Sequence, residues 1–167
     1  PNYNACATVD DGSCLATLAN DNCADAIALT LNDPAIIASN IGSSNDGGDP
    51  SCYFGTSGAG DVWYSFVADG GDIVVSTSTD DGSIGDTVMA IYDACGGSEV
   101  DCDDDGGVSA FSSISGDCTV FVAGTTYFVQ VFEFGGDTEG TFSIEVTSTP
   151  SVGCADPTAT NFVSVCA

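Results

Sequence analysis

The sequence contains no lysine, no arginine and no histidine among its 167 residues, against 25 aspartates and glutamates. Its net charge at pH 7 is therefore −25. A field of this sign repels phosphate backbones and anionic membrane surfaces, so nucleic acid is excluded as a partner and cations are attracted. Because no basic side chain exists, every carboxylate must be solvated, hydrogen-bonded or shared with a metal ion.

The missing basic side chains also remove most catalytic chemistry. Histidine and lysine supply the usual general base and the Schiff-base amine, and histidine completes Ser–His and Cys–His pairs. Carboxylate catalysis remains possible, and Glu133 and Glu145 lie on expected strands that could bring them close. Nothing distinguishes these two from solvated surface groups, so the sequence predicts that the protein is not an enzyme.

No apolar run is long enough to span a bilayer, and no signal peptide follows Pro1, so we expect no direct membrane insertion and any targeting information elsewhere. Nine cysteines lie in polar, glycine-rich sequence without the close C-x-x-C units of a cytosolic zinc site. Cysteines in such a setting are typical of disulfides formed in an oxidising compartment. The expected location is extracellular or at the cell surface.

Short segments of alternating apolar and polar residues, separated by Gly/Asp turns, predict about eight β-strands. In residues 61–67, for example, Val62, Tyr64 and Phe66 share one face. No segment keeps a 3.6-residue apolar period. The expected fold is all-β, an antiparallel, jelly-roll-like β-sandwich. Its strands are expected at residues 61–67, 72–78, 86–93, 118–123, 125–134 and 139–147, after apolar runs at 24–31 and 35–41, with an acidic loop at 95–107.

The expected organisation is a β-sandwich domain at residues 20–149 between two irregular, disulfide-stapled linker segments, residues 1–19 and 150–167. The motifs Asp61-Val-Trp-Tyr-Ser-Phe66 and Gly124-Thr-Thr-Tyr127 lie in the central part. Through them, residues 23–147 resemble β-sandwich domains of secreted bacterial proteins, akin to prepeptidase C-terminal domains. The resemblance implies a non-catalytic accessory or adhesive module within a large extracellular polypeptide.

The two ends of the chain complement each other. Joined end to end, residues 153–162 and 8–14 resemble the Cys-rich segment G-C-x-D-P-x-A-x-N-Y…A-T-V-D-D-G-S-C that separates domains in surface proteins of Bacteroidota. An insertion carrying Cys166 and Cys6 departs from that pattern. The resemblance implies that this chain is one repeat of a larger assembly. The two halves of the Cys-rich segment would then meet either within one polypeptide or between neighbouring chains.

Sequence proximity and these resemblances imply a disulfide map. The implied pairs are Cys23–Cys52, Cys95–Cys102 and, across the repeat junction, Cys14–Cys154 and Cys6–Cys166. In the alternative, Cys6–Cys14 and Cys154–Cys166 each close a local loop. Either scheme leaves Cys118 as the ninth cysteine, a free thiol or the site of an intermolecular bond.

Two groups of aspartates are candidate calcium sites. Asp101, Asp103 and Asp105 precede Gly106 in the D-x-D-x-D-G pattern that opens a calcium loop. Ser112 replaces the bidentate acid of an EF-hand, so other oxygens, such as those of Asp61 or Asp86, would have to complete the site. The second group is Asp10 and Asp11 with Asp156. A solvated acidic loop is the alternative at both places.

Aromatic residues admit two interpretations. A sugar-stacking platform could be formed by Trp63, Tyr53, Phe54 and Tyr92 with the outward set Phe128, Phe132 and Phe134. In the alternative, Trp63 and Tyr64 belong to the core. If the alternating set Phe128, Phe132 and Phe134 is exposed, it forms an apolar stripe that a neighbouring subunit would cover. Thr87, within Asp86-Thr-Val88, matches a pattern that resembles the O-glycosylation acceptor of Bacteroidota, with Thr77 and Thr79 as alternatives.

Together these features predict a structural repeat unit of an extracellular bacterial fibre or large surface adhesin. Copies would assemble head to tail through their acidic, Cys-rich ends, calcium would stiffen the junction, and glycans are further candidate partners. The expected assembly residues are Asp10, Cys14, Cys154, Phe162, Phe128 and Phe132. The alternative is a carbohydrate-binding accessory module of a secreted hydrolase.

Overall fold

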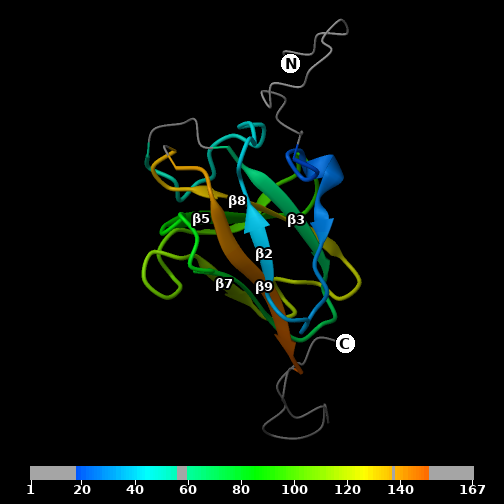
Figure 1. Ribbon diagram of the computed structural model, residues 1–167. Helices are drawn as coiled ribbons and strands as arrows, with labels where there is room; N and C mark the ends of the chain where they lie inside the picture. Colours follow the sequence, from blue (N-terminus) through cyan, green and yellow to red (C-terminus); the bar gives the residue numbers. More distant parts are fainter. Residues whose placement is uncertain (1–17, 56–59, 137, 151–167) are drawn as a thin grey trace, which may run out of the picture.

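A computed structural model describes residues 18–55, 60–136 and 138–150. It is a sandwich of two sheets, one with the strand order β1-β3-β8-β5-β6 and the other with the order β2-β9-β4-β7 (Figure 1). The expected antiparallel β-sandwich is confirmed, and among the described strands only β1 and β3 pair in parallel. The strands are β1 (Ile27–Ala28), β2 (Ile36–Ser39), β3 (Val62–Val67), β4 (Asp72–Ser78), β5 (Thr87–Tyr92), β6 (Glu99–Asp103), β7 (Ser113–Gly116), β8 (Thr126–Glu133) and β9 (Thr141–Thr149), preceded by a 3₁₀ turn, η1 (Cys23–Asp25).

The core lies between the sheets and follows from the alternation of the long strands. Successive side chains of a strand point to opposite faces, so an apolar residue at every second position makes one continuous apolar face. In β3 these residues are Val62, Tyr64 and Phe66, and in β9 they include Phe142 and Ile144, all buried in one cluster. The centre of the interface between the two sheets is therefore apolar, and buried polar residues such as Thr87 and Ser148 lie at its ends.

Three segments differ from the expectation. Residues 118–123 form a turn, because the Asp117 carboxylate and carbonyl accept hydrogen bonds from the following amides and Tyr127 Oη accepts one from Val122 N–H. The preceding strand β7 was not expected. Strand β6 lies within the expected acidic loop, and its carboxylates Glu99, Asp101 and Asp103 mark it as a charged edge strand. Charge is a common way to protect an open sheet edge from pairing.

The outer face of the five-stranded sheet carries a second, smaller apolar cluster. Phe132 and Val88 are register partners on this face, and Tyr53 from the loop before β3 covers them. The Tyr53 and Phe132 rings meet edge to face with centroids 5.0 Å apart, and Tyr53 Oη donates to the Phe134 carbonyl at 2.9 Å. Phe132 is only 3% exposed, and Phe128 and Phe134 are half-buried. Tyr53 therefore covers the part of the expected apolar stripe formed by Phe132 and Phe134, while Phe128 is half-buried outside this cluster.

Two disulfides fasten the covering segments to this sheet, and their pairing differs from the expected map. Cys23 bonds Cys95 and Cys52 bonds Cys102, with Cα atoms 5.6 and 5.7 Å apart. Sequence proximity misled the prediction because η1 is placed beside the turn after β5. Cys118 is also disulfide-bonded, so the expectation that it is left over is wrong. The terminal cysteines Cys6, Cys14, Cys154 and Cys166 lie outside the described residues, and so do Asp10, Asp11, Asp156 and Phe162.

The described chain runs through the sandwich from end to end. Leu18 lies at the end where η1 is found, and β9 ends at Thr149 at the opposite end (Figure 1). Among the described residues there is no helix of the length and apolarity needed to cross a membrane. The sandwich thus presents its two chain connections at opposite ends.

Candidate functional site

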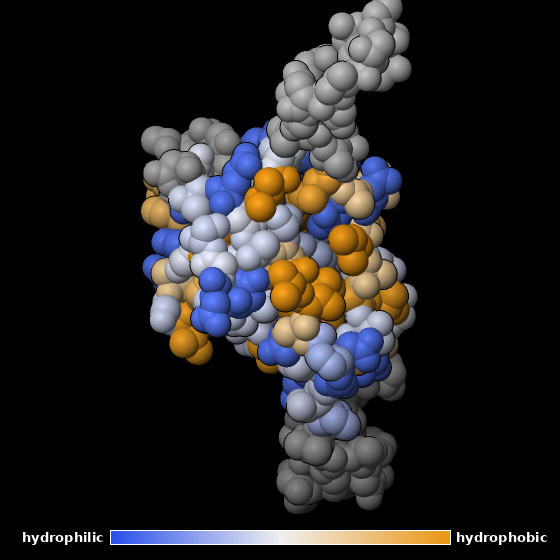
Figure 2. Space-filling model, viewed as in Figure 1, coloured by the Kyte–Doolittle hydropathy of each residue, from blue (hydrophilic) through white to orange (hydrophobic). Residues whose placement is uncertain are grey.

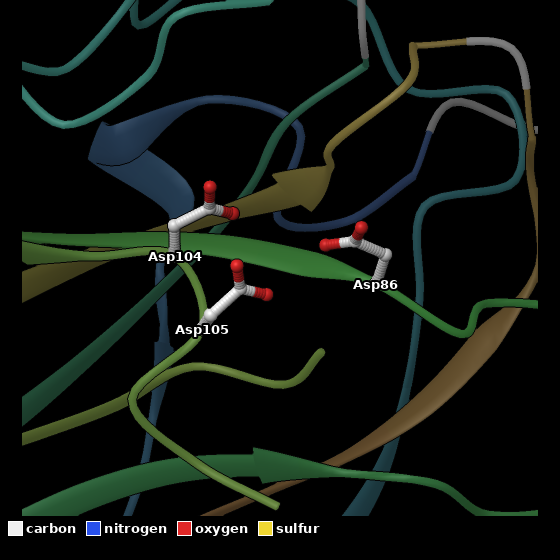
Figure 3. Close-up of side chains that lie close together, drawn as sticks. All are labelled: Asp86, Asp104 and Asp105. Carbon is white, nitrogen blue, oxygen red and sulfur yellow. The ribbon is translucent and has the colours of Figure 1, made fainter. Parts of the chain in front are cut away.

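An acidic cluster forms at the junction of β5 and β6. The antiparallel pairing of these strands places the start of β5 beside the end of β6, and a parallel bridge joins Asp86 to Ala110. Asp86 comes directly before β5, while Asp104 and Asp105 come directly after β6. Their side chains approach one another (Figure 3), and one carboxylate oxygen from each lies within 4.8 Å of the other two.

The electrostatics of the cluster are unfavourable for three charged carboxylates. Burial, reinforced by the charges of Asp104, Asp105 and Glu133, raises the pKa of Asp86 to about 6. Burial and the charges of Asp105 and Asp103 also raise the pKa of Asp104. Among the described residues, one buried carboxylate oxygen of Asp86 and one of Asp104 have no hydrogen-bond partner. Buried polar oxygens without partners are costly, and a divalent cation would compensate them.

The donor set suits a hard cation. Calcium takes six to eight oxygen ligands, so three carboxylates would supply part of its coordination shell, and backbone carbonyls and waters would supply the rest. Asp86, Asp104 and Asp105 are therefore the described residues that could hold the ion. In chemical terms the cluster can bind and neutralise, and it contains no nucleophile or base other than carboxylate.

Only one of the three aspartates expected in the loop belongs to this cluster. Asp101 Oδ1 accepts from the Cys102 amide at 2.9 Å. Asp103 Oδ2 accepts from the Gly106 and Ser113 amides at 2.8 and 2.7 Å, and so holds the loop between β6 and β7 in place. The alternating D-x-D-x-D pattern failed because β6 extends through Asp103, so residues 101 and 103 follow the geometry of a strand. Asp104 was missed, although the adjacent run of aspartates 103–105 was visible in the sequence.

Asp61, the other expected supplementary ligand, has a structural role. It is fully buried, and its carboxylate accepts from the amides of Asp46 and Gly47 at 3.0 and 2.9 Å and from Gln130 Nε2 at 2.7 Å. Burial raises the pKa of Asp61 although these hydrogen bonds oppose the shift. Asp61 therefore fixes the loop before β3 onto the five-stranded sheet.

A cavity of about 370 Å³ opens beside this loop, and Trp63 and Tyr92 both line it. Their ring centroids are 5.7 Å apart at 44°. Trp63 is 4% exposed, and its indole N–H has no hydrogen-bond partner among the described residues. The disulfide Cys23–Cys95 ties two walls of the cavity together. The other lining residues are Asn22, Cys23, Ala24, Asp46, Gly47, Gly96 and Gly97.

The aromatic residues do not form one platform. Trp63 and Tyr92 share the cavity, Tyr53 covers Phe132, and Phe54 is 89% exposed by itself. Tyr92 Oη donates to Gln130 Oε1 at 2.9 Å, and burial with the nearby charges of Glu99 and Asp61 raises its pKa to about 12. Tyr92 is therefore a neutral hydrogen-bonding group throughout the ordinary pH range.

Thr87 is not available as a glycosylation acceptor in the folded chain. Its side chain is 0% exposed, and its hydroxyl hydrogen-bonds with the Thr77 hydroxyl at 2.7 Å and accepts from the Ser112 amide at 3.1 Å. The alternative Thr77 is buried by the same network. Thr79 is exposed. The expectation for Thr87 failed because the start of β5 lies inside the sandwich.

Comparison with known proteins gives one family and a similar solved structure. The family model described as "Galactose binding domain-like", in a T9SS-associated group, matches residues 19–146. Among solved structures, the pre-peptidase C-terminal domain of a collagenase from Bacillus anthracis is similar, with 15% sequence identity and a TM-score of 0.45. That match covers 72% of this chain and 93% of the other. A search of curated proteins found no match.

Proposed function

The chain belongs to the T9SS-associated, galactose-binding-domain-like family, and we propose that this extracellular module is a structural repeat unit of a bacterial fibre or large surface adhesin. The observation that carries the proposal is the position of its chain connections. Leu18 and Thr149 lie at opposite ends of the sandwich (Figure 1), as head-to-tail assembly requires. A module with both connections at one end would instead hang from the assembly as a side branch.

The charge of the chain is consistent with this role. A net charge of −25 without any basic residue keeps the sides of neighbouring assemblies apart and hydrated. End-to-end contacts then have to come from uncharged segments, from disulfides or from shared cations. The proposed contacts are the terminal residues Asp10, Cys14, Cys154 and Phe162 together with the half-buried Phe128. Phe132 is excluded by its burial.

Calcium is the proposed cofactor of the folded unit. Asp86, Asp104 and Asp105 would hold it, and the ion would neutralise the cluster that otherwise opposes close approach of β5 and β6. The second proposed calcium group, Asp10 and Asp11 with Asp156, would act at the junction between units. A fibre outside the cell would then gain stability from the calcium of its surroundings.

Electron microscopy of the native material tests the assembly. We expect beads repeated head to tail at a constant rise, and shorter assemblies for the variants Cys14→Ser and Cys154→Ser of the full chain. Non-reducing electrophoresis should show covalent multimers in the wild type and fewer in both variants. Native material that consists only of discrete single units, with or without calcium, would sink the proposal.

Carbohydrate binding is the second candidate function, and the Trp63 cavity is the observation that favours it. Sugars present apolar C–H faces that stack on aromatic rings and hydroxyls that both donate and accept hydrogen bonds. Trp63 is the sole tryptophan, so its fluorescence reports directly on this cavity. Titration with a panel of neutral oligosaccharides should shift that fluorescence in the wild type and not in Tyr92→Ala. Phe54→Ala, which alters an exposed ring outside the cavity, is the matched control, and an unchanged wild-type spectrum with every sugar would rule the candidate out.

A further inference from the structure

The four outer edges of the two sheets differ in how they are protected. In the five-stranded sheet, β6 carries three carboxylates and β1 is only two residues long. In the four-stranded sheet, β7 exposes no large apolar side chain, since its only one, Ile114, is buried. Strand β2 is also uncharged and four residues long, like β7, but it is the edge of this sheet that exposes large apolar side chains. Charge is a usual protection of open edges, and β2 lacks it.

Strand β2 exposes isoleucines on an uncharged stretch of chain. Ile37 is 72% exposed and Ile41, just beyond the strand, is 50% exposed. Figure 2 shows apolar surface gathered where β2 lies in Figure 1. Residues 34–45 contain no acidic residue, in a chain with 25 of them. Because this stretch carries no carboxylate, no negative charge on β2 itself opposes the pairing of another strand at this edge.

The register shows which side of β2 is open. Ile36 and Ala38 pair with Ile144 and Phe142 of β9, and Ala38 is buried in the core. Strand β9 is the only partner of β2 among the described strands. The backbone groups on the other side of β2 can therefore form a ladder with an added strand, as in β-augmentation.

We propose that the outer edge of β2 receives residues 158–165 of a neighbouring copy as an added strand. This proposal rests on the head-to-tail assembly proposed above and names the surface that would receive the neighbour. Residues 157–167 contain no acidic residue, and Phe162, Val163 and Val165 are types that favour strands. Like charges placed opposite each other destabilise a strand pair, so two copies of this acidic chain can pair only through uncharged segments.

The geometry of the chain permits this contact between copies. Strand β2 runs antiparallel to β9, so its carboxyl end lies at the end of the sandwich opposite to Thr149. A neighbour that follows head to tail would present the carboxyl end of its β2 to the departing chain. Asn161 lies twelve positions after Thr149, and at about 3.3 Å per extended residue this distance is up to roughly 40 Å, enough to cross a junction.

Photo-cross-linking of the full chain tests the contact. Ile37 is replaced by p-benzoyl-phenylalanine, and ¹⁴N-labelled and ¹⁵N-labelled chains are mixed before assembly. Digestion before aspartate separates the fragment that begins at Asp33 and carries position 37 from the fragment that begins at Asp156. We expect these two fragments to be cross-linked with mixed isotopes. The same replacement at Val67, an exposed residue of the inner strand β3, is the control and should not give this product.

A second variant measures the contribution to assembly. Ile37→Glu adds a carboxylate to the open edge and should raise the concentration of chain needed for assembly at least about tenfold, whereas Val67→Glu should leave it unchanged. Cross-links from position 37 to β2 of another copy, or only to the fragment of the same chain, would overturn the proposed occupant. Fibres that form without the mixed cross-link would overturn this proposal and leave the structural function standing. Absence of any assembly would overturn both.

Discussion

At Asp86 the chain gathers negative charge that no basic residue can neutralise. The aspartate lies beside Asp104 and Asp105, and its pKa is raised to about 6. In the unfolded chain its pKa returns to about 3.8. The folded state therefore binds the proton more tightly, and this contribution to stability is fully present below pH 3.8 and is lost as the pH rises through about 6.

The first prediction concerns Asp86→Asn without calcium. Above pH 6 the variant lacks the penalised charge, so its free energy of unfolding should exceed that of the wild type by about 1 kcal/mol, a value reduced for solvent screening. Below pH 4 the two proteins should converge. Urea denaturation in a chelator at pH 3.5, 5 and 7.5 measures the difference. Asp25→Asn, at an exposed position, is the control, and an equal gain there would attribute the effect to net charge.

The second prediction concerns calcium, which should turn the destabilising effect of the three carboxylates into a stabilising one. If the ion binds the three carboxylates, the wild type gains about 2.7 kcal/mol at a calcium concentration one hundred times the dissociation constant. Its melting temperature should rise with calcium and fall again with a chelator. Asp86→Asn should lose most of that rise because it removes one of the ligands. A calcium-induced rise that is the same in the variant and in the wild type would contradict the site.

At the scale of elements, strands with a strong alternating pattern could be predicted and those positioned by tertiary contacts could not. The sequence predicts strands β3, β4, β8 and β9 almost as found, because apolar residues occupy every second position in them. The sequence of strand β6 predicts a loop, since an edge strand can be as acidic as a turn. The apolar pattern of residues 118–123 predicts a strand, but the Asp117 turn overrides it.

The same limit applies to the site. Asp105 was expected and Asp86 was considered as a supplementary ligand, but their meeting with Asp104 depends on the register of β5 with β6. Cys23 and Cys95 are 72 residues apart in the sequence, and only the path of the chain brings them together. Proximity in the sequence therefore predicts correctly that these four cysteines form disulfides, but it pairs them wrongly.

The third prediction concerns the disulfide of β6. Cys52–Cys102 spans 50 residues, so the double variant Cys52→Ala, Cys102→Ala should lose about 4 kcal/mol through the freedom that its unfolded chain regains. Guanidinium denaturation of the oxidised proteins measures the loss. The loop that carries Tyr53 should also become more accessible, with faster amide exchange there than in β9. A variant as stable as the wild type would show that the hydrogen bonds of this loop suffice.

At the scale of the whole molecule, the two chain connections at opposite ends suit the proposed unit of a series. The disulfides Cys23–Cys95 and Cys52–Cys102 tie the covering segments onto the five-stranded sheet, and in the four-stranded sheet β2 is an uncharged edge that exposes isoleucines. In the proposed fibre the acidic surface would keep neighbouring assemblies apart, while that edge and residues 157–167, which contain no acidic residue, are where copies would meet. The proposed fibre therefore follows from where charge is absent as much as from where it is present.

The disulfide Cys23–Cys95 also limits how far the unit can be stretched. Tension applied at Leu18 and Pro150 passes from Cys23 directly to Cys95, so the chain between them carries no load. The two ends are 132 positions apart and the bond removes 72, which leaves at most 60 residues to extend. At about 3.4 Å per residue this is roughly 200 Å, compared with about 450 Å after reduction. Single-molecule pulling with and without reductant should show this difference in contour length. Under tension, the disulfide would therefore prevent complete extension of the unit.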